Sequence, residues 1–99
     1  MTPEEYVRVL EKQYEIIGTA RDTIYLTSEF AHDNFVWPED VRPAASDDIV
    51  VGQIVYHIDG DDGPFWNIVE EVLRPNDSFK AYCADDGCRY GLDGAWVKI

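Results

Sequence analysis

The sequence has few basic residues: eight Lys and Arg stand against 20 Asp and Glu, which leaves a formal net charge of −12 over 99 residues. Nucleic acids and anionic membrane surfaces repel a protein of this sign, so we expect neither as a direct partner. A basic protein surface, of the kind that nucleic-acid-handling proteins carry, would attract it. Because negative charge also keeps many proteins in solution, the charge alone does not fix a function.

Cysteine and histidine are also scarce, with two residues of each. Cys83 and Cys88 flank a tetrapeptide that is typical of a hairpin tip. Two reduced, half-buried thiols are the preferred interpretation, and a disulfide formed on oxidation is the alternative. A zinc site needs further ligands at suitable spacing, and His32 and His57 lie far apart in the sequence. An aspartate-rich turn at residues 59–64 has proline where a calcium-binding loop needs glycine. The sequence therefore predicts no metal site and no cofactor.

Catalytic sequence motifs are absent as well. The chain has no nucleophile elbow, phosphate-binding loop or dinucleotide fingerprint. No apolar run approaches the length of a membrane span, and no secretory signal is visible in the first residues. We therefore expect a cytoplasmic protein that binds a macromolecule and does not catalyse a reaction. An unrecognised small enzyme is the alternative from another class.

The chain is rich in groups that form a core. Apolar residues make up 45% of it, including three Trp, six Tyr and four Phe. Disordered acidic chains are poor in such residues, and 99 residues suffice for one compact domain. We expect a single domain over residues 1–99, with a helical N-terminal part at 1–46 and a β-rich part at 47–99.

A helix is predicted at the start of the chain. Thr2 is a suitable N-cap, Pro3 fits the first helical position, and Glu5 completes a capping box. One helical stripe then carries apolar residues at Val7, Leu10, Tyr14 and Ile17. Gly18 follows as a C-terminal cap. These signals predict a helix over residues 3–17.

The segment at residues 19–31 is ambiguous. Its β-branched and aromatic residues at 23–27 favour a strand, whereas Thr19 and Asp22 fit the start of a second helix. Residues 28–31 fit the start of a short helical turn as a further alternative. The strand is the preferred interpretation. Residues 37–41 are typical of a tight turn, and residues 42–46 of a connector, because two prolines interrupt any continuous helix there.

Short β-rich runs alternate with turn residues from residue 47 onward. Five strands are predicted, at residues 49–58, 65–73, 79–83, 88–92 and 95–99. The pattern Val51-Gly52-Gln53-Ile54-Val55, followed by a glycine-rich turn and a strand that includes Trp66, resembles the opening strands of small SH3-like barrels. This resemblance implies a binding module. We expect an α+β fold in which the N-terminal helix packs on a small, mostly antiparallel, SH3-like β-barrel or sheet.

The candidate binding residues are aspartates of the predicted turns. They are Asp47, Asp48, Asp59, Asp61, Asp62, Asp85 and Asp86. Several such turns on one side of a barrel would present a row of carboxylates comparable to the phosphates of a nucleic acid. The alternative is that aspartate is simply a favoured turn residue.

Aromatic residues beside the predicted turns form a second candidate. Trp37, Phe65 and Trp66 fit an exposed anchor of the kind enriched at interfaces. They fit equally well as side chains that close a small core.

In size, charge and lack of an active-site motif, the chain resembles DNA-mimic anti-restriction and anti-CRISPR proteins of phages. This resemblance of type implies an inhibitor that occupies a basic protein or a nucleic-acid-binding complex. An immunity or antitoxin-like protein that neutralises a basic toxin is the alternative. The sequence indicates no oligomeric state.

Overall fold

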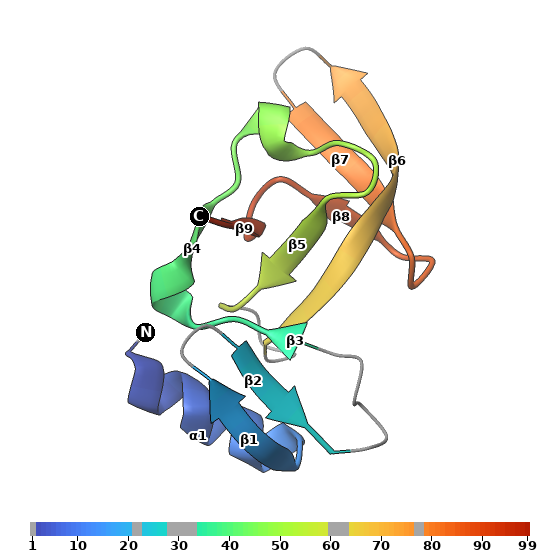
Figure 1. Cartoon of the computed structure of the whole chain (residues 1–99). Helices are drawn as coiled ribbons and strands as arrows, with labels where there is room; N and C mark the ends of the chain where they lie inside the picture. Colours follow the sequence, from blue (N-terminus) through green and yellow to red (C-terminus); the bar gives the residue numbers. More distant parts are fainter. Residues whose placement is uncertain (1, 21–22, 28–33, 60–63, 77–78) are drawn as a thin grey trace.

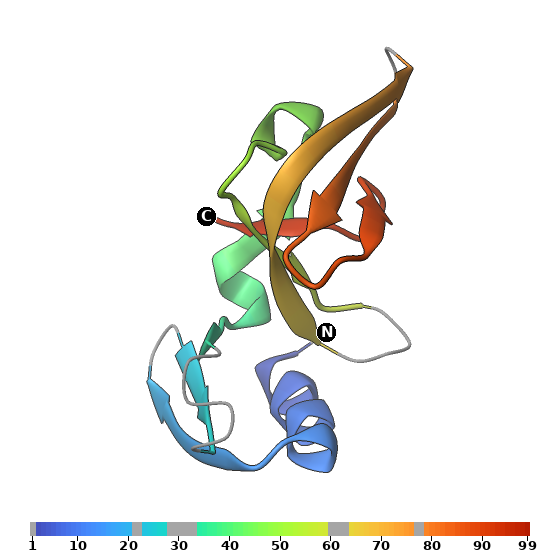
Figure 2. The same ribbon diagram turned by 90° about the vertical axis from the view of Figure 1, so that its right-hand side faces the viewer.

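The computed structural model describes residues 2–20, 23–27, 34–59, 64–76 and 79–99. One α-helix and a three-stranded sheet lie at one end of the molecule, and a six-stranded sheet extends from them (Figures 1 and 2). Every strand pair among the described residues is antiparallel. The predicted α+β class is confirmed.

The helix α1, Pro3–Gln13, begins where the sequence predicts. The Thr2 hydroxyl accepts a hydrogen bond from the Glu5 backbone N–H at 3.3 Å, and the Glu5 carboxylate accepts one from the Thr2 N–H at 3.4 Å. This reciprocal pair satisfies two backbone donors that the first turn of a helix leaves free.

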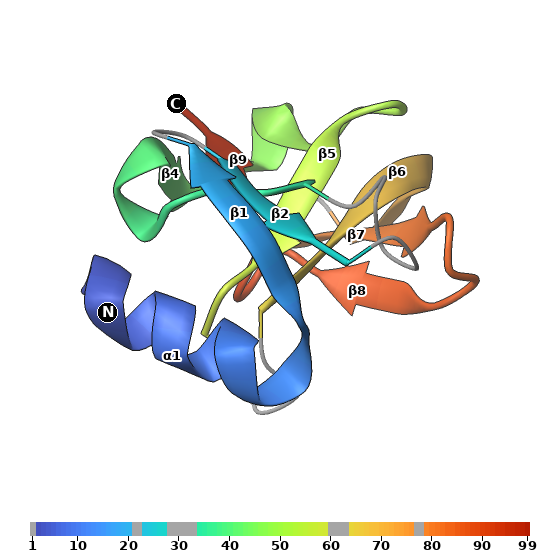
Figure 3. The same cartoon turned by 60° about the horizontal axis from the view of Figure 1, so that its bottom comes forward.

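The predicted end of this helix is wrong. The helix stops at Gln13, Tyr14 is extended, and the chain turns directly into strand β1, Ile16–Ala20 (Figure 3). Gly18 lies inside that strand and is not among the glycines with positive φ, so it is no helix cap. The adjacent β-branched Ile16 and Ile17 favour a strand, and pairing with β2 replaces the last helical turn.

The three-stranded sheet has the order β1-β2-β3, with β2 at Thr23–Leu26 and β3 at Asn34–Phe35. The strand preferred for residues 23–27 is therefore confirmed. The β1–β2 register shifts between Ile16 and Gly18, which indicates a bulge at Ile17. Ile17 is 64% exposed, whereas Ile24 and Leu26 on β2 are fully buried.

The tight turn predicted at residues 37–41 is confirmed as the short 3₁₀ helix η2, Pro38–Asp40. The connector predicted at residues 42–46 is only partly correct. Strand β4, Val41–Pro43, pairs with the C-terminal strand β9, and the 3₁₀ turn η3, Ser46–Asp48, follows it. Local sequence does not reveal β4, because its partner lies more than 50 residues away.

The six-stranded sheet contains the five strands predicted for the C-terminal half. They are β5, Ile54–His57; β6, Phe65–Asn76; β7, Phe79–Ala84; β8, Arg89–Gly91; and β9, Trp96–Lys98. The first predicted run is too long, because residues 50–53 form a turn in which Gly52 has φ +91°. Strand β6 instead continues past Leu73, the predicted end of the second run.

The strand order β4-β9-β5-β6-β7-β8 places β4 and β8 at the two ends of the sheet. No ladder among the described residues joins these two strands, so the sheet is not closed into a barrel. The expected N-terminal helix and the mostly antiparallel sheet are both present. The strand pairing does not support the expected closure of the sheet into a barrel.

Strand β5 separates two apolar clusters. Tyr56 and the following Ile58 belong to the cluster formed by α1 and the small sheet, whereas Val55 belongs to the cluster within the large sheet. Successive side chains of a strand point to opposite faces, so one strand contributes to both cores. This explains the nearly continuous apolar run at residues 54–58.

Candidate functional site

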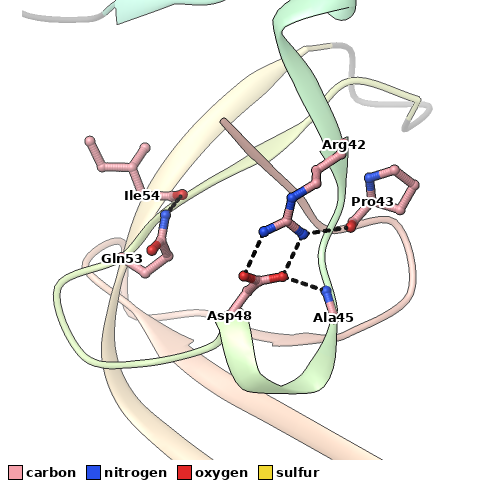
Figure 4. Close-up of polar contacts among 6 residues, drawn as sticks. All are labelled: Arg42, Pro43, Ala45, Asp48, Gln53 and Ile54. Atoms are coloured by element: carbon pink, nitrogen blue, oxygen red, sulfur yellow. Dashed lines mark hydrogen bonds and ion pairs between the residues drawn. The ribbon is translucent and has the colours of Figure 1, made fainter. Parts of the chain in front are cut away.

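The acidic turn η3 is held in place by an ion pair. Asp48 receives two hydrogen bonds from the Arg42 guanidinium, at 2.7 and 2.8 Å, and one from the Ala45 backbone N–H at 2.7 Å (Figure 4). The hydrogen bonds from Arg42 lower the pKa of the Asp48 carboxyl to about 2. The charge of Asp48 is thus compensated within the chain, while the neighbouring Asp47 is exposed.

The other acidic turn, between β7 and β8, also uses its carboxylates as turn groups. Asp85 accepts a hydrogen bond from the Ile68 backbone N–H at 2.9 Å. Asp86 accepts one from the Cys88 N–H at 2.9 Å and one from the Tyr90 hydroxyl at 2.6 Å. Both residues remain exposed, so they shape the turn and still present negative charge to solvent.

The acidic candidates are distributed over separate parts of the molecule. The η3 turn and the β7–β8 turn lie well apart, on different sides of β5 and β6 (Figure 1). Asp59, which follows β5, is exposed. Asp61 and Asp62 fall outside the described residues. The structure therefore does not bring Asp47, Asp85 and Asp86 into one row.

The three aromatic candidates pack against the same apolar cluster. Trp37, Phe65 and Trp66 are each partly buried against the core that α1 contributes to. Phe65 also stacks on the His57 ring, with centroids 4.6 Å apart. Trp66 and Trp96 each pair with Tyr56 from opposite sides of β5. Trp37 also lines two hollows on the protein surface.

Three adjoining hollows surround the start of α1, and we call them together the Trp37 groove. Pro3 lines all three, and Trp37 and Glu39 line two each. One, of about 420 Å³, is lined by Pro3, Thr19, Ala20, Trp37 and Glu39. A second, of about 330 Å³, is lined by Pro3, Glu4, Val7, Arg8, Glu11 and Trp37. The third, of about 210 Å³, is lined by Pro3, Pro38, Glu39, Ile58, Asp59 and Trp96.

The Trp37 groove combines a fixed aromatic ring with carboxylates. The indole N–H of Trp37 donates a hydrogen bond to the Ala20 carbonyl at 2.8 Å, which holds the ring in one orientation. The acidic lining residues are Glu4, Glu11, Glu39 and Asp59, and all four are exposed. Arg8 is the one basic residue among those lining the three hollows. The lining of the groove thus combines apolar side chains with four carboxylates and one guanidinium.

A buried polar network lies on the other side of β5. The Tyr82 hydroxyl donates to the Asn67 side-chain oxygen at 2.9 Å and lies 2.7 Å from His57 Nε2. Because Tyr82 gives its only hydroxyl proton to Asn67, the contact with His57 requires a proton on Nε2. His57 is 8% exposed, and Tyr90 contacts its ring. The Asn67 side-chain nitrogen also lies 3.4 Å from His57 Nε2, but a protonated Nε2 cannot accept its hydrogen. The network therefore pairs the Tyr82 hydroxyl, the Asn67 side-chain oxygen and His57 Nε2.

The protonation of His57 should be linked to stability. Burial lowers the pKa of its imidazole, and the nearby Asp86 carboxylate only partly offsets this effect. The unfolded chain then binds a proton more readily than the folded one, so stability falls as the pH drops below the unfolded-state pKa of about 6.5. We expect the stability difference between the wild type and His57→Gln to be larger at high pH than at low pH.

Urea unfolding of both proteins above and below that pKa measures this difference. The carboxylates common to both proteins titrate alike, so their contribution cancels. A stability difference that stays constant, or that grows as the pH falls, would contradict a neutral buried His57.

The two cysteines are free thiols on different faces of the β7–β8 hairpin. Cys83 pairs with Arg89, whereas the Ala84 N–H donates to the Cys88 carbonyl, so Cys88 lies opposite Ala84. Adjacent residues of a strand point to opposite faces, so the two thiols do not face each other. This register agrees with the preferred interpretation of two reduced thiols and does not support the alternative of a disulfide across the hairpin.

Among the described residues, no three His, Cys, Asp or Glu side chains are grouped so that they would hold a metal ion. In the same part of the chain, no helix has the length and apolar character needed to cross a lipid bilayer. Comparison of the chain with protein-family models, with curated proteins and with solved structures finds no match.

Proposed function

We propose that this chain is an acidic binding protein that occupies a basic surface of a nucleic-acid-handling protein or complex and thereby inhibits it. The observation that carries the proposal is the surplus of carboxylates. Even if every Lys and Arg neutralised one acid, 12 carboxylates would keep their charge. Such a surface attracts a basic groove and competes with nucleic acid for it.

The placement of the acids supports this function in a modified form. Asp47, Asp59, Asp85 and Asp86 are exposed. The η3 turn and the β7–β8 turn, which carry three of them, lie well apart (Figure 1). We therefore propose a contact that uses one side of the protein, with the remaining charge contributing long-range attraction. The likeness of residues 47–99 to SH3-like binding modules, and the likeness to phage anti-defence proteins, belong to the same proposal.

Affinity capture from a lysate of the host tests the function. The immobilised protein is incubated at about 0.1 M and about 1 M salt, where the Debye length falls from about 10 Å to about 3 Å. We expect a nucleic-acid-binding protein to be retained at the lower salt only, and to be released by added duplex DNA. Retention of the same protein at both salt concentrations and in the presence of duplex DNA would contradict the proposal.

A matched pair of variants sharpens this test. Asp85→Asn combined with Asp86→Asn removes two charges and keeps one side-chain oxygen at each residue, for the bonds from the Ile68 and Cys88 backbone N–H groups. The second oxygen of Asp86, which accepts from the Tyr90 hydroxyl, is lost.

Asp47→Asn combined with Asp59→Asn removes two charges from side chains that accept no hydrogen bond from the part of the chain that the structure describes. Reduced capture by the Asp85 and Asp86 pair alone would place the β7–β8 turn at the contact, and reduced capture by the Asp47 and Asp59 pair alone would place the contact elsewhere. A basic toxin in the captured fraction would instead favour the antitoxin-like alternative.

A further inference from the structure

We propose that the Trp37 groove binds an arginine side chain on the surface of a basic protein partner. This inference rests on the proposed function and names the place of contact. It follows from three features that the sequence alone does not bring together: an oriented indole, carboxylates in the hollows that this indole lines, and apolar side chains beside it.

The first feature is the Trp37 ring itself. Its N–H is already bonded to the Ala20 carbonyl, so a ligand meets the ring surface and not the polar N–H. The ring is also packed against the core cluster, which limits its motion. A side chain held in this way loses little conformational entropy when a ligand binds. Tryptophan is also the aromatic residue that attracts cations most strongly.

The second feature is charge complementarity. Glu39 lines one of the two hollows that Trp37 lines. Glu4 and Glu11 line the other, where they outnumber the single guanidinium of Arg8. A cation in the groove would therefore meet carboxylates on more than one side. A phosphate or a lipid headgroup would be repelled by the same groups, and so would a second copy of a chain with a net charge of −12.

The third feature is the combination of a flat apolar surface with carboxylates, which suits arginine better than lysine. The planar guanidinium stacks on an indole and still directs N–H groups to carboxylates at its edge. The lysine ammonium is more strongly hydrated and loses more on leaving water. The pyrrolidine ring of Pro3 and the side chain of Val7 offer apolar contacts for the aliphatic part of the arginine chain.

The test is an NMR titration of the ¹⁵N-labelled full chain with the peptide acetyl-Gly-Arg-Gly-Arg-Gly-amide. The control peptide carries citrulline in place of both arginines, which keeps the shape and removes the charge. We expect saturable shifts of the Trp37 indole N–H and of the Glu4 and Glu39 amides with the arginine peptide only. Equal shifts at the η3 turn and the β7–β8 turn would show general charge attraction and would overturn the proposal.

Two variants with the same change in charge separate the groove from the rest of the surface. Glu39→Gln should weaken arginine-peptide binding about five-fold, which corresponds to about 1 kcal/mol, the upper end of the range for an exposed ion pair. Asp47→Asn lies outside the groove and should leave the affinity within about 1.5-fold, since screening weakens distant charges. Equal weakening by both variants would overturn the groove assignment.

The outcomes also distinguish this inference from the function on which it rests. If a basic partner is captured in a salt-sensitive way but Glu39→Gln binds it as well as Asp47→Asn does, the groove assignment fails and the function stands. If no such partner is captured, the function fails. A Trp37 shift that depends on protein concentration without peptide would assign the groove to a second copy and would overturn arginine binding.

Discussion

Replacing Leu10 by alanine should lower the free energy of unfolding by about 2–5 kcal/mol, the usual range for removing a fully buried leucine side chain. Leu10 is completely buried, in the cluster that also contains Tyr6, Ile24 and Leu26. The substitution leaves a cavity between α1 and the three-stranded sheet. Denaturant unfolding followed by circular dichroism measures the loss.

Ile17→Ala is the matched control, because Ile17 lies on the same apolar stripe in the sequence but is 64% exposed in the structure. Its substitution should change stability by no more than about 0.5 kcal/mol, as for other surface positions. If Ile17→Ala were as destabilising as Leu10→Ala, a helix continuing to Ile17 would be favoured over the bulged strand.

Replacing Tyr82 by phenylalanine should lower the free energy of unfolding by about 2 kcal/mol, because a buried polar group that loses its partner costs about 1–3 kcal/mol. The hydroxyl removed is the one that contacts both His57 and Asn67, and Asn67 is only 2% exposed. In a domain of this size the midpoint of thermal unfolding should drop by roughly 8–16 °C, at about 4–8 °C for each kcal/mol.

Tyr6→Phe is the control for this prediction. The Tyr6 hydroxyl is also buried, but among the described residues it has no hydrogen-bond partner. Removing a polar group that is already unpaired should leave stability unchanged or increase it. Equal losses for Tyr6→Phe and Tyr82→Phe would mean that the hydrogen bonds of Tyr82 do not account for its effect.

The parts of the fold that the sequence predicts correctly depend on neighbouring residues. The capping box needs only Thr2 and Glu5, three positions apart. The β7–β8 hairpin depends on the turn around Gly87, whose φ of +83° suits glycine. The alternation of strands and turns after residue 47 likewise follows from local composition.

The incorrect or missing parts depend on distant contacts. The end of α1 is decided by the pairing of Ile16 with Leu26, which competes with a helical stripe that continues through Ile17. Strand β4 exists because β9 pairs with it from the other end of the chain. The double burial of β5 requires both sheets to be in place. Local propensity gives no signal for any of these interactions.

The candidate site also combines features that the local sequence predicts with features that depend on distant contacts. The turn aspartates are recognisable from composition, but their hydrogen bonds are not, and the sequence does not distinguish Asp48, which is ion-paired, from the exposed Asp47. The Trp37 groove collects Pro3, Ala20, Trp37 and Glu39 from three separate segments. Its position beside a predicted turn marks Trp37 as a candidate anchor, whereas the sequence marks Pro3 only as the start of a helix.

The most direct test of the central claim is the dissociation constant of the complex between this chain and its captured partner, measured over a range of salt concentrations with and without duplex DNA. We predict that the dissociation constant rises steeply with salt and that the chain and the DNA exclude each other from the partner. The account would be contradicted by a dissociation constant that does not change with salt, measured for a complex that binds DNA at the same time.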